Sequence, residues 1–569
     1  MNGKKPLVRL RIIAVLIILA GLGFAAKLYI IQVMRHDDFK ALADRQYVKS
    51  DGGIFSRGTI YFKSKDGDLI SAATLESGYL LAINPREIKD KEAAYEALSG
   101  IVTIDHALFI VKASKDDPYE EIAKKISEEQ MRVIKNKNIA GVSLYPMKWR
   151  YYPGSFVAAH ELGFLGYARD DSYSGRYGLE KYYDGLLLRT KENAYANFFV
   201  QIFSDIKTSV SGEALQGDIV ATIEPTVEAS LEDTLRRIMS KWSAKEAGGI
   251  IMDPKTGEIY AMASEPGFNP NDLSNISDPT VFGNPLVESV REMGSIVKTL
   301  TMAAGIDAGV VSSTTTYEDK GYILADGAKI WNHDRTINGH TTMQDVLDKS
   351  LNIGAAYVER QLGNKLFAKY MNAFGLEEKT GIDLPNEAQN ITTNLKSPRD
   401  VEYITASFGQ GLAFTPISMI RALSALANGG TLPTPHIVTR INYGGGLGKS
   451  ISPPEGARVI SKETSDKITD MLIAVVDKAL LGGKIKNQYY TIAAKTGTAQ
   501  IAKLEGGGYY DDRFFHSFMG YFPAKNPKFI ILLYVLEPQT NQFAADTLAV
   551  PFADLAKLLI NYYQIPPDR

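Results

Sequence analysis

A serine and a lysine three positions apart, Ser295 and Lys298, are the residues whose types and spacing best suit chemistry. The apolar pattern from Ile296 onward predicts a helix, and Gly294 marks its start, so both side chains should lie on one face. A serine hydroxyl is a poor nucleophile until a neighbouring base takes its proton. A lysine becomes such a base when it is desolvated and placed beside another cation. The free N–H groups of a first helical turn also favour a developing alkoxide. The pair therefore predicts a nucleophile and its base.

A second motif follows 55 residues later, where Ser350 and Asn352 stand two positions apart. A hydroxyl and an amide at this spacing can share a loop or a helical turn that faces the same cleft. The hydroxyl can relay a proton between a leaving group and a base, and the amide can bind a substrate carbonyl. On its own, Ser-x-Asn is more often a turn or a helix cap.

A third motif consists of Lys495, Thr496, Gly497 and Thr498. It follows an expected strand, Tyr489 to Ala494, and continues into a polar strand. An edge strand at this point could pair with an extended peptide substrate. Gly497 lets a ligand approach the backbone closely, and Lys495 supplies positive charge for a substrate carboxylate. We therefore predict a substrate-binding strand here.

Two of the motifs also occur elsewhere in the chain. A second Ser-x-x-Lys runs from Ser204 to Lys207 without accompanying chemistry, and Lys-Thr-Gly recurs at Lys255 and Lys379, in an expected hairpin turn and an expected connection. The prediction therefore depends on the ordered set Ser-x-x-Lys, Ser-x-Asn and Lys-Thr-Gly in these local contexts. That order is the signature of active-site serine enzymes that recognise penicillin.

The elements that must position these residues are predicted from apolar periodicity and turn residues. No regular repeat is present, and the pattern mixes strands with helices. The expected elements are strands at Ser56–Tyr61 and Asp218–Ile223, helices at Ala93–Leu98, Tyr119–Val133 and Thr226–Trp242, and a hairpin of Ala247–Asp253 with Glu258–Ser264.

Residues 12–34 are predicted to form a membrane anchor. Ile12 to Ala26 is an unbroken apolar run, and the span reaches Met34 if Lys27 extends toward the interface. Four basic residues precede the run and place the N-terminus in the cytoplasm: Lys4, Lys5, Arg9 and Arg11. A cleaved signal peptide is less favoured, because no clear small-x-small site precedes a polar start. We expect a single-pass protein of the plasma membrane, with its catalytic part outside the cytoplasm.

Composition excludes several other functions. The 569 residues contain no cysteine, so disulfides, thiolate catalysis and cysteine-bound metal are ruled out. The seven histidines are scattered and none forms a metal-binding helix pattern, so no metal and no cofactor is expected. The net charge of −2 gives no basic field for nucleic acid. A phosphate loop at Gly444 to Ser450 is also excluded, because its first glycine would fall at Tyr443.

The chain resembles the class B penicillin-binding proteins of the FtsI-like group over nearly its full length. Besides the three motifs, the resemblance is carried by Arg57–Tyr61, Arg150–Gly154, Ala159–Gly163, Gly178–Glu180, Ala406–Gly411, Thr415–Pro416 and His516–Pro523. It implies an α/β (α+β) transpeptidase domain with an antiparallel sheet flanked by helices. The expected organisation is a cytoplasmic tail (1–11), the anchor (12–34), an extended α+β pedestal (35–215) and the transpeptidase domain (216–569).

The resemblance also implies a function, a serine-type D-Ala-D-Ala transpeptidase acting on peptidoglycan stem peptides and inhibited by β-lactams. Ser295 would be acylated, Lys298 would be the base, and Ser350 and Asn352 would relay a proton and position substrate. Lys495, Thr496 and Thr498 would hold the terminal carboxylate, and the backbone N–H groups of Ser295 and Thr498 would form the oxyanion hole. Since the chain shows no polymerase motif, a glycan polymerase of the FtsW/RodA type is the expected partner.

The sequence departs from the family pattern at Met293, where proline is common, and at Leu351, where serine is common. Neither change removes a reacting group. The alternative function is a penicillin-recognising sensor or a catalytically silent homologue. A class A β-lactamase would leave the pedestal and the anchor unexplained. A role in division or elongation, the diamino acid of the stem peptide and the oligomeric state are not determined by these residues.

Overall fold

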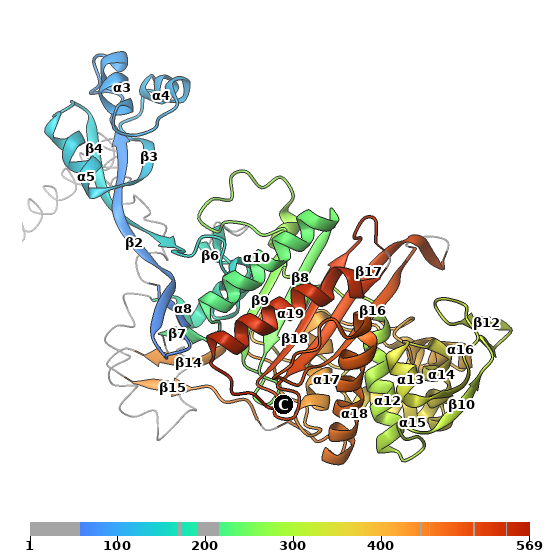
Figure 1. The fold of residues 1–569 in the computed structure, drawn as a ribbon. Coiled ribbons are helices and arrows are strands. Elements are labelled where there is room, and N and C mark those ends of the chain that lie inside the picture. Colours follow the sequence, from blue (N-terminus) through green and yellow to red (C-terminus); the bar gives the residue numbers. More distant parts are fainter. Residues whose placement is uncertain are drawn as a thin grey trace, which may run out of the picture. The chain divides into compact units, whose positions relative to one another are not determined.

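The computed structural model describes residues 57–167, 173–189, 216–443, 447–454, 456–503, 507–541 and 543–569 (Figure 1). The expected anchor at 12–34 and the second Ser-x-x-Lys at 204–207 lie outside these ranges. Within them, no helix combines the length and the apolar character needed to cross a bilayer.

A five-stranded antiparallel sheet forms the centre of the larger part of the chain. The order across the sheet is β16 (Ala493–Ala502), β17 (Tyr509–Phe522), β18 (Phe529–Leu536), β8 (Glu246–Met252) and β9 (Ile259–Glu265). Every residue of the central strand β18 is buried. A strand covered on both faces reads as a continuous apolar run, as Phe529–Leu536 does. The expected hairpin of β8 and β9 is confirmed, and β16 is an edge strand.

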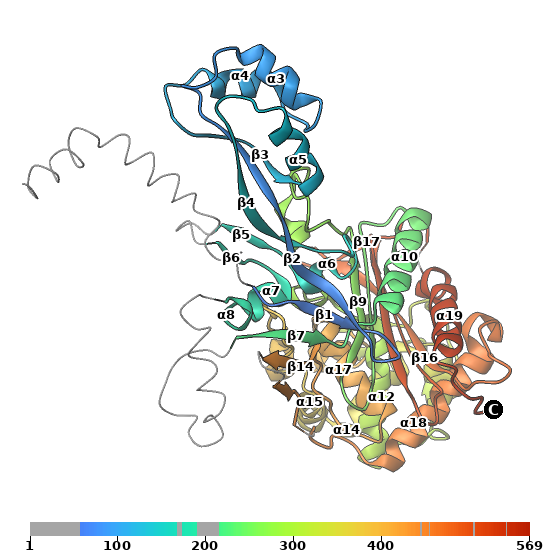
Figure 2. The same ribbon diagram turned by 90° about the vertical axis from the view of Figure 1, so that its left-hand side faces the viewer.

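Helices cover both faces of this sheet. In Figures 1 and 2, α10 (Pro225–Trp242) and α19 (Ala544–Tyr562) run along one face, and α17 (Pro416–Ala427), α12 (Val297–Asp307) and α18 (Lys462–Ala474) lie on the other. Pro225 stands at the first turn of α10, and the Glu224 side chain accepts a hydrogen bond from the Val227 N–H. Both features favour a helix start at this point. The predicted helix Thr226–Trp242 and the antiparallel sheet flanked by helices are therefore confirmed.

Shorter elements complete this part of the chain. Strands β10 (Thr316–Asp319) and β13 (Gly339–Thr342) pair, as do β11 (Tyr322–Ala325) and β12 (Ala328–Trp331). Strand β7 (Gly217–Ala221) pairs with β1 (Ile60–Lys63) and β14 (Val438–Tyr443), which pairs with β15 (Gly448–Ser450). A further pair is β5 (Leu165–Tyr167) with β6 (Tyr173–Gly175). The remaining helices here are α6 (Ala159–Leu162), α7 (Gly178–Tyr182), α8 (Asp184–Leu187), α11 (Pro285–Glu288), α13 (Met343–Asp348), α14 (Asn352–Leu362), α15 (Asn364–Ala373) and α16 (Asp400–Ala406).

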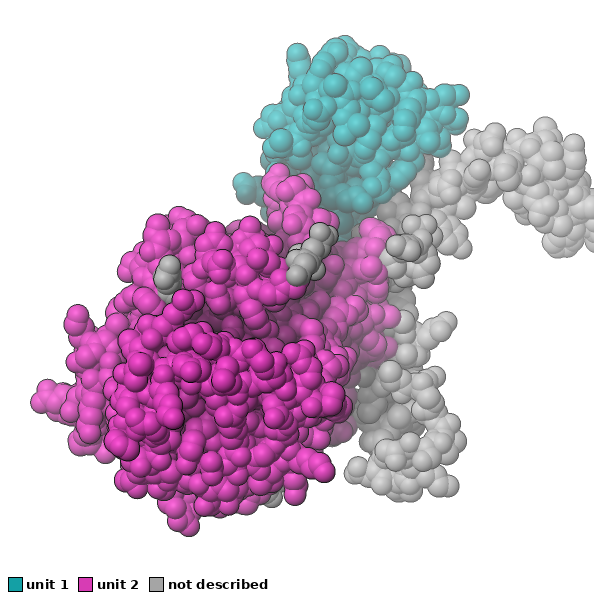
Figure 3. Space-filling model, turned by 90° about the vertical axis from the view of Figure 1, so that its right-hand side faces the viewer, with its two compact units in different colours: residues 1–57, 75–150 teal, residues 58–74, 151–569 magenta. Residues whose placement is uncertain are grey.

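The chain divides into two compact units, coloured separately in Figure 3. The described residues of the smaller unit are Arg57 and 75–150, and the larger unit holds those of 58–74 and 151–569. In the smaller unit, the later part of β2 (Leu69–Ile83) pairs with β3 (Glu120–Ile126) and β4 (Val142–Tyr151). Helices α3 (Lys91–Ser99), α4 (His106–Ala113) and α5 (Glu128–Asn136) bury Leu98, Phe109 and Ile134 against Leu81 and Ile83.

The predicted helix Tyr119–Val133 is wrong. Residues 120–126 form β3, because they pair with β2 far away in the sequence. The helix begins only at Glu128, where Ser127 and Gln130 form a reciprocal capping box. Such a cap is a local stop for any helix that would enter from the N-terminal side. The apolar residues of 119–133 therefore belong to a strand and to the start of the following helix, and not to one continuous helix.

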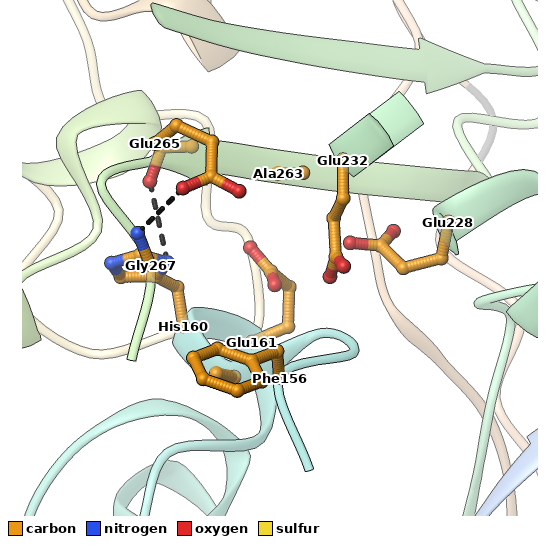
Figure 4. Close-up of a pocket in the computed structure, with 10 residues that line it drawn as sticks. Phe156, His160, Glu161, Glu228, Glu232, Ala263, Glu265 and Gly267 are labelled. Carbon is orange, nitrogen blue, oxygen red and sulfur yellow. Dashed lines mark hydrogen bonds between the residues drawn. The ribbon is translucent and has the colours of Figure 1, made fainter. Parts of the chain in front are cut away.

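Three carboxyl groups meet at a small cavity of about 10 Å³ in the larger unit (Figure 4). Glu161 lies on α6, whereas Glu228 and Glu232 lie one turn apart on α10. The three carboxyls accept hydrogen bonds from Asn284 Nδ2, Met262 N–H and Ala158 N–H, respectively, and Glu232 also pairs with Arg236 at 3.6 Å. Oε1 of Glu228 has no hydrogen-bond partner among the residues that the structure describes. Burial raises the pKa of Glu161 to about 8 and that of Glu232 to about 7. Burial and then the two neighbouring carboxylates raise the pKa of Glu228 well above its usual value.

We predict that Glu228→Gln raises stability at alkaline pH. The unfolded chain releases these protons near its ordinary carboxyl pKa of 4.5, but the folded protein keeps them to a higher pH. The stability from this cluster is therefore complete below pH 4.5 and is lost as pH rises toward 8. Glutamine is neutral at every pH, so the melting temperature of the variant should fall less over this window. Asp233→Asn, at an exposed site on the same helix, is the control, and equal slopes for Glu228→Gln and wild type would contradict the prediction.

Candidate active site

Ser295 lies in a short 3-10 turn, Gly294–Ile296, that leads directly into α12. Gly294 has a φ of +61° and donates its N–H to Gly409 O at 3.1 Å. A Cβ on Gly294 would lie 2.8 Å from Thr498 O, so a side chain here would clash with the strand carrying the third motif. The turn thus needs glycine for both its backbone angle and its close approach. The predicted helix start before the serine is confirmed.

Lys298 is only 1 % exposed and lies one turn after Ser295. Its Nζ donates to Ser350 O at 2.6 Å, to Asn352 Oδ1 at 2.8 Å and to Ser350 Oγ at 3.3 Å. Burial lowers the pKa of Lys298 well below its usual value, and the positive charge of Lys495 lowers it further. No carboxylate is hydrogen-bonded to this amine among the residues that the structure describes. An amine in this setting is readily neutral and can therefore act as a base.

Ser350 and Asn352 come from the junction of two helices. Ser350 has a φ of +56°, which turns the chain sharply between α13 and α14. Asn352 is the first residue of α14, and its Nδ2 donates to Trp331 O at 3.0 Å while its Oδ1 faces Lys298. Ser350 and Asn352 therefore lie in one turn, and both contact the Lys298 amine.

Lys495 extends from β16, the edge strand of the central sheet, and is 2 % exposed. Its Nζ donates to Ser350 Oγ at 3.0 Å and to Thr496 O at 3.2 Å. Burial lowers the pKa of Lys495 to about 8, although the charge of Asp348 opposes this shift. The Ser350 hydroxyl thus lies between two buried amines that come from different parts of the sequence. The predicted strand Tyr489–Ala494 is wrong in its bounds, because the strand begins only at Ala493.

The strand carrying Thr496, Gly497 and Thr498 packs against the turn of Ser295. A Cβ on Gly497 would lie 2.5 Å from Met293 O and 3.2 Å from Ile296 N, so only glycine permits this contact. Ser517 Oγ, on the neighbouring strand β17, donates to Met293 O at 2.8 Å. Thr498 Oγ1 accepts the Ala544 N–H at 3.2 Å from the start of α19. Thr496 and Thr498 are both half-buried.

Hydrogen bonds therefore join Lys298, Ser350, Asn352 and Lys495 into one cluster, with Ser295 one turn away from Lys298. Neither Ser517 nor His333 belongs to the three motifs, so the sequence predicted no role for them. Ser517 lies in the segment His516–Pro523, which resembles the family pattern. Nothing in the neighbouring sequence indicates its hydrogen bond to Met293 O. His333 lies two residues after Trp331, whose backbone oxygen accepts a hydrogen bond from Asn352. Only tertiary contacts bring this histidine near the cluster.

The antiparallel sheet, the Ser295 turn that leads into α12 with Lys298, and the Lys-Thr-Gly strand beside them fit the class of serine enzymes that recognise penicillin. A family model described as the penicillin-binding protein transpeptidase domain matches residues 247–555, and one described as the penicillin-binding protein dimerisation domain matches 56–198. The chain belongs to the penicillin-binding protein transpeptidase family.

Individual relatives agree with this assignment. The chain is 32 % identical to stage V sporulation protein D of Bacillus subtilis over 85 % of this chain and 75 % of that protein. It is 25 % identical to peptidoglycan D,D-transpeptidase FtsI of Escherichia coli over 85 % and 80 %. The crystal structure of penicillin-binding protein 3 of Mycobacterium tuberculosis with aztreonam has the same fold, with a TM-score of 0.68, 23 % identity and coverage of 90 % and 97 %.

Proposed function

We propose that this chain is a peptidoglycan D,D-transpeptidase and that Ser295 is its nucleophile. The main support for these catalytic roles is that the Ser350 hydroxyl lies between the buried amines of Lys298 and Lys495. Burial and the mutual repulsion of the two positive charges disfavour protonation of both amines at once, although Asp348 partly offsets this for Lys495, so Lys298 is readily neutral. A neutral amine one helical turn from a serine is the activation that serine acyl transfer requires.

In the first half-reaction, Lys298 takes the proton of the Ser295 hydroxyl as its oxygen attacks the penultimate D-Ala carbonyl. The negative charge that develops on the carbonyl oxygen is stabilised by the backbone N–H groups of Ser295 and Thr498. Loss of one such donor typically lowers the rate about 100-fold or more. The proton then passes through Ser350 to the departing amine, the peptide bond breaks, and D-Ala leaves.

In the second half-reaction, an amine from a neighbouring stem peptide attacks the acyl-enzyme. Its proton returns through Ser350 and Lys298 to the Ser295 oxygen as the ester bond breaks, and a cross-link forms. Asn352 fixes the Lys298 amine and offers its amide to the substrate. Lys495, Thr496 and Thr498 bind the terminal carboxylate along β16, and the edge of this strand pairs with the extended peptide. β-Lactams inhibit by acylating the same serine.

The direct test is to supply the full-length protein with lipid-linked peptidoglycan precursor, in the presence of a glycan polymerase, and to measure D-Ala release and cross-linked product. Both should appear in equal amounts and both should stop after treatment with penicillin. A protein that is acylated by penicillin but releases no D-Ala and forms no cross-link would be a sensor, and this outcome would refute the proposal.

We also propose that residues 12–34 anchor the chain in the plasma membrane, that 35–215 form a pedestal, and that 216–569 form the catalytic domain outside the cytoplasm. The apolar run at 12–26 behind four basic residues supports this arrangement. The partner would be a glycan polymerase of the FtsW/RodA type, since a transpeptidase without a polymerase domain needs new glycan strands. Failure of the full-length protein to co-purify with such a polymerase in detergent would count against the partner.

A further inference from the structure

A histidine outside the three motifs lies beside the lysine cluster. The segment before His333 is tied to the second motif by two hydrogen bonds, from Asn352 Nδ2 to Trp331 O at 3.0 Å and from Ile353 N–H to Asn332 Oδ1 at 3.2 Å. Asn332 also donates to the buried Asp319 carboxylate at 2.8 Å. The backbone leading into His333 is therefore held in place next to Asn352.

The His333 ring also meets the other side of the cluster. It packs edge-on against the Phe543 ring, with 6.4 Å between ring centroids. Phe543 directly precedes Ala544, whose N–H donates to Thr498 Oγ1 on the substrate-binding strand. His333 thus follows a segment that is hydrogen-bonded to Asn352, and its ring contacts the residue before Ala544, the partner of Thr498, while part of the side chain stays exposed to solvent. A group in this place can meet a second substrate that arrives from solution.

The surroundings of His333 favour the neutral form of its ring. Partial desolvation lowers the pKa of His333, the positive charges of Lys298 and Lys495 lower it further, and Asp334 acts in the opposite direction. The Asp334 carboxylate accepts hydrogen bonds from Thr336, not from the ring. Neither ring nitrogen has a hydrogen-bond partner among the residues that the structure describes. A neutral imidazole with a free lone pair is a ready proton acceptor.

The second half-reaction needs such an acceptor. The attacking amine arrives as an ammonium ion and must lose a proton before its lone pair can attack. Within each half-reaction, Lys298 and Ser350 pass on the one proton that they receive, so they cannot also take up the extra proton of the ammonium. A base beside the cluster that removes this extra proton would allow the acceptor to attack at a pH at which most of it is ammonium.

We propose that His333 is the general base that takes this proton from the ammonium group of the acceptor strand. This role rests on the proposed transpeptidase function. The N–H bond of the ammonium breaks, its electron pair becomes the nucleophile, and the new imidazolium releases the proton to water.

The experiment compares wild type, His333→Gln and the control His340→Gln, at an exposed histidine paired with Glu318. Two rates are measured on the full-length protein: acylation of Ser295 by fluorescent penicillin, and aminolysis of a peptide thioester donor by D-alanine. We expect acylation to be unchanged in both variants. Aminolysis by His333→Gln should fall about 100-fold at neutral pH, within the usual range for a general base. Raising the pH should restore it, since D-alanine then loses its proton to water.

Three outcomes would overturn the proposal. Aminolysis by His333→Gln could equal that of wild type, acylation could fall in parallel with it, or the defect could persist at high pH. A structural role for His333 predicts the last two, because misplacement of Asn352 would impair both half-reactions. If penicillin does not label Ser295 in the wild type, the proposed function itself fails, and the role of His333 fails with it.

Discussion

Ser295→Ala is expected to abolish covalent labelling by fluorescent penicillin and to reduce transpeptidation to background. Removing the nucleophile of a serine enzyme costs on the order of 10⁶-fold in rate, and no other described residue offers a hydroxyl one helical turn before a buried amine. The hydrogen bonds of Lys298 go to Ser350 and Asn352, so they survive the substitution. The variant should therefore fold normally, and its loss of labelling can be assigned to the missing hydroxyl.

Ser204→Ala is the matched control, because Ser204 begins the other Ser-x-x-Lys of the chain. It should label at the wild-type rate. Mass spectrometry of the labelled wild type should find one adduct, on the peptide that contains Ser295. Labelling that persists in Ser295→Ala, or that disappears in Ser204→Ala, would show that the nucleophile has been assigned to the wrong motif.

Lys298→Met is expected to lower the rate of acylation about 1,000-fold, within the range of 100- to 10,000-fold typical of general-base catalysis. Methionine keeps the length of the side chain but cannot accept a proton. In the wild type, acylation should increase with pH as Lys298 loses its proton, and the increase should occur below the ordinary lysine pKa of 10.5, because burial and Lys495 lower its value. The variant should lack this step in its pH profile.

Lys349→Met is the control for this second prediction, since Lys349 is an exposed lysine beside Ser350. It should retain both the rate and the pH profile of the wild type. Thermal melts of the two variants separate a loss of chemistry from a loss of folding. An unchanged pH profile in Lys298→Met would mean that another group is the base, and Lys495 would be the first to examine.

Much of the larger unit could be predicted from sequence. Helix α10 and the β8–β9 hairpin were expected, because Pro225 and the turn after Asp253 are local signals that need no distant partner. By contrast, Glu120–Ile126 was mistaken for helix. Its strand conformation depends on pairing with β2, and residues 84–119 separate the two strands. The start of β16 was misplaced for the same reason, since its first paired residue, Ala493, is set by Tyr521.

By itself, the sequence determined which groups are available for chemistry. The spacing of Ser295 and Lys298 on one helix follows from neighbours in the chain, and so does the glycine before them. Only the tertiary structure decided that Lys298 and Lys495 share the Ser350 hydroxyl, and that His333 lies beside them. The physical reason is that helix starts and turns depend on short-range contacts, whereas burial and charge proximity depend on segments that meet only after folding. Those long-range contacts lower the pKa of both lysines and thereby make the chemistry available.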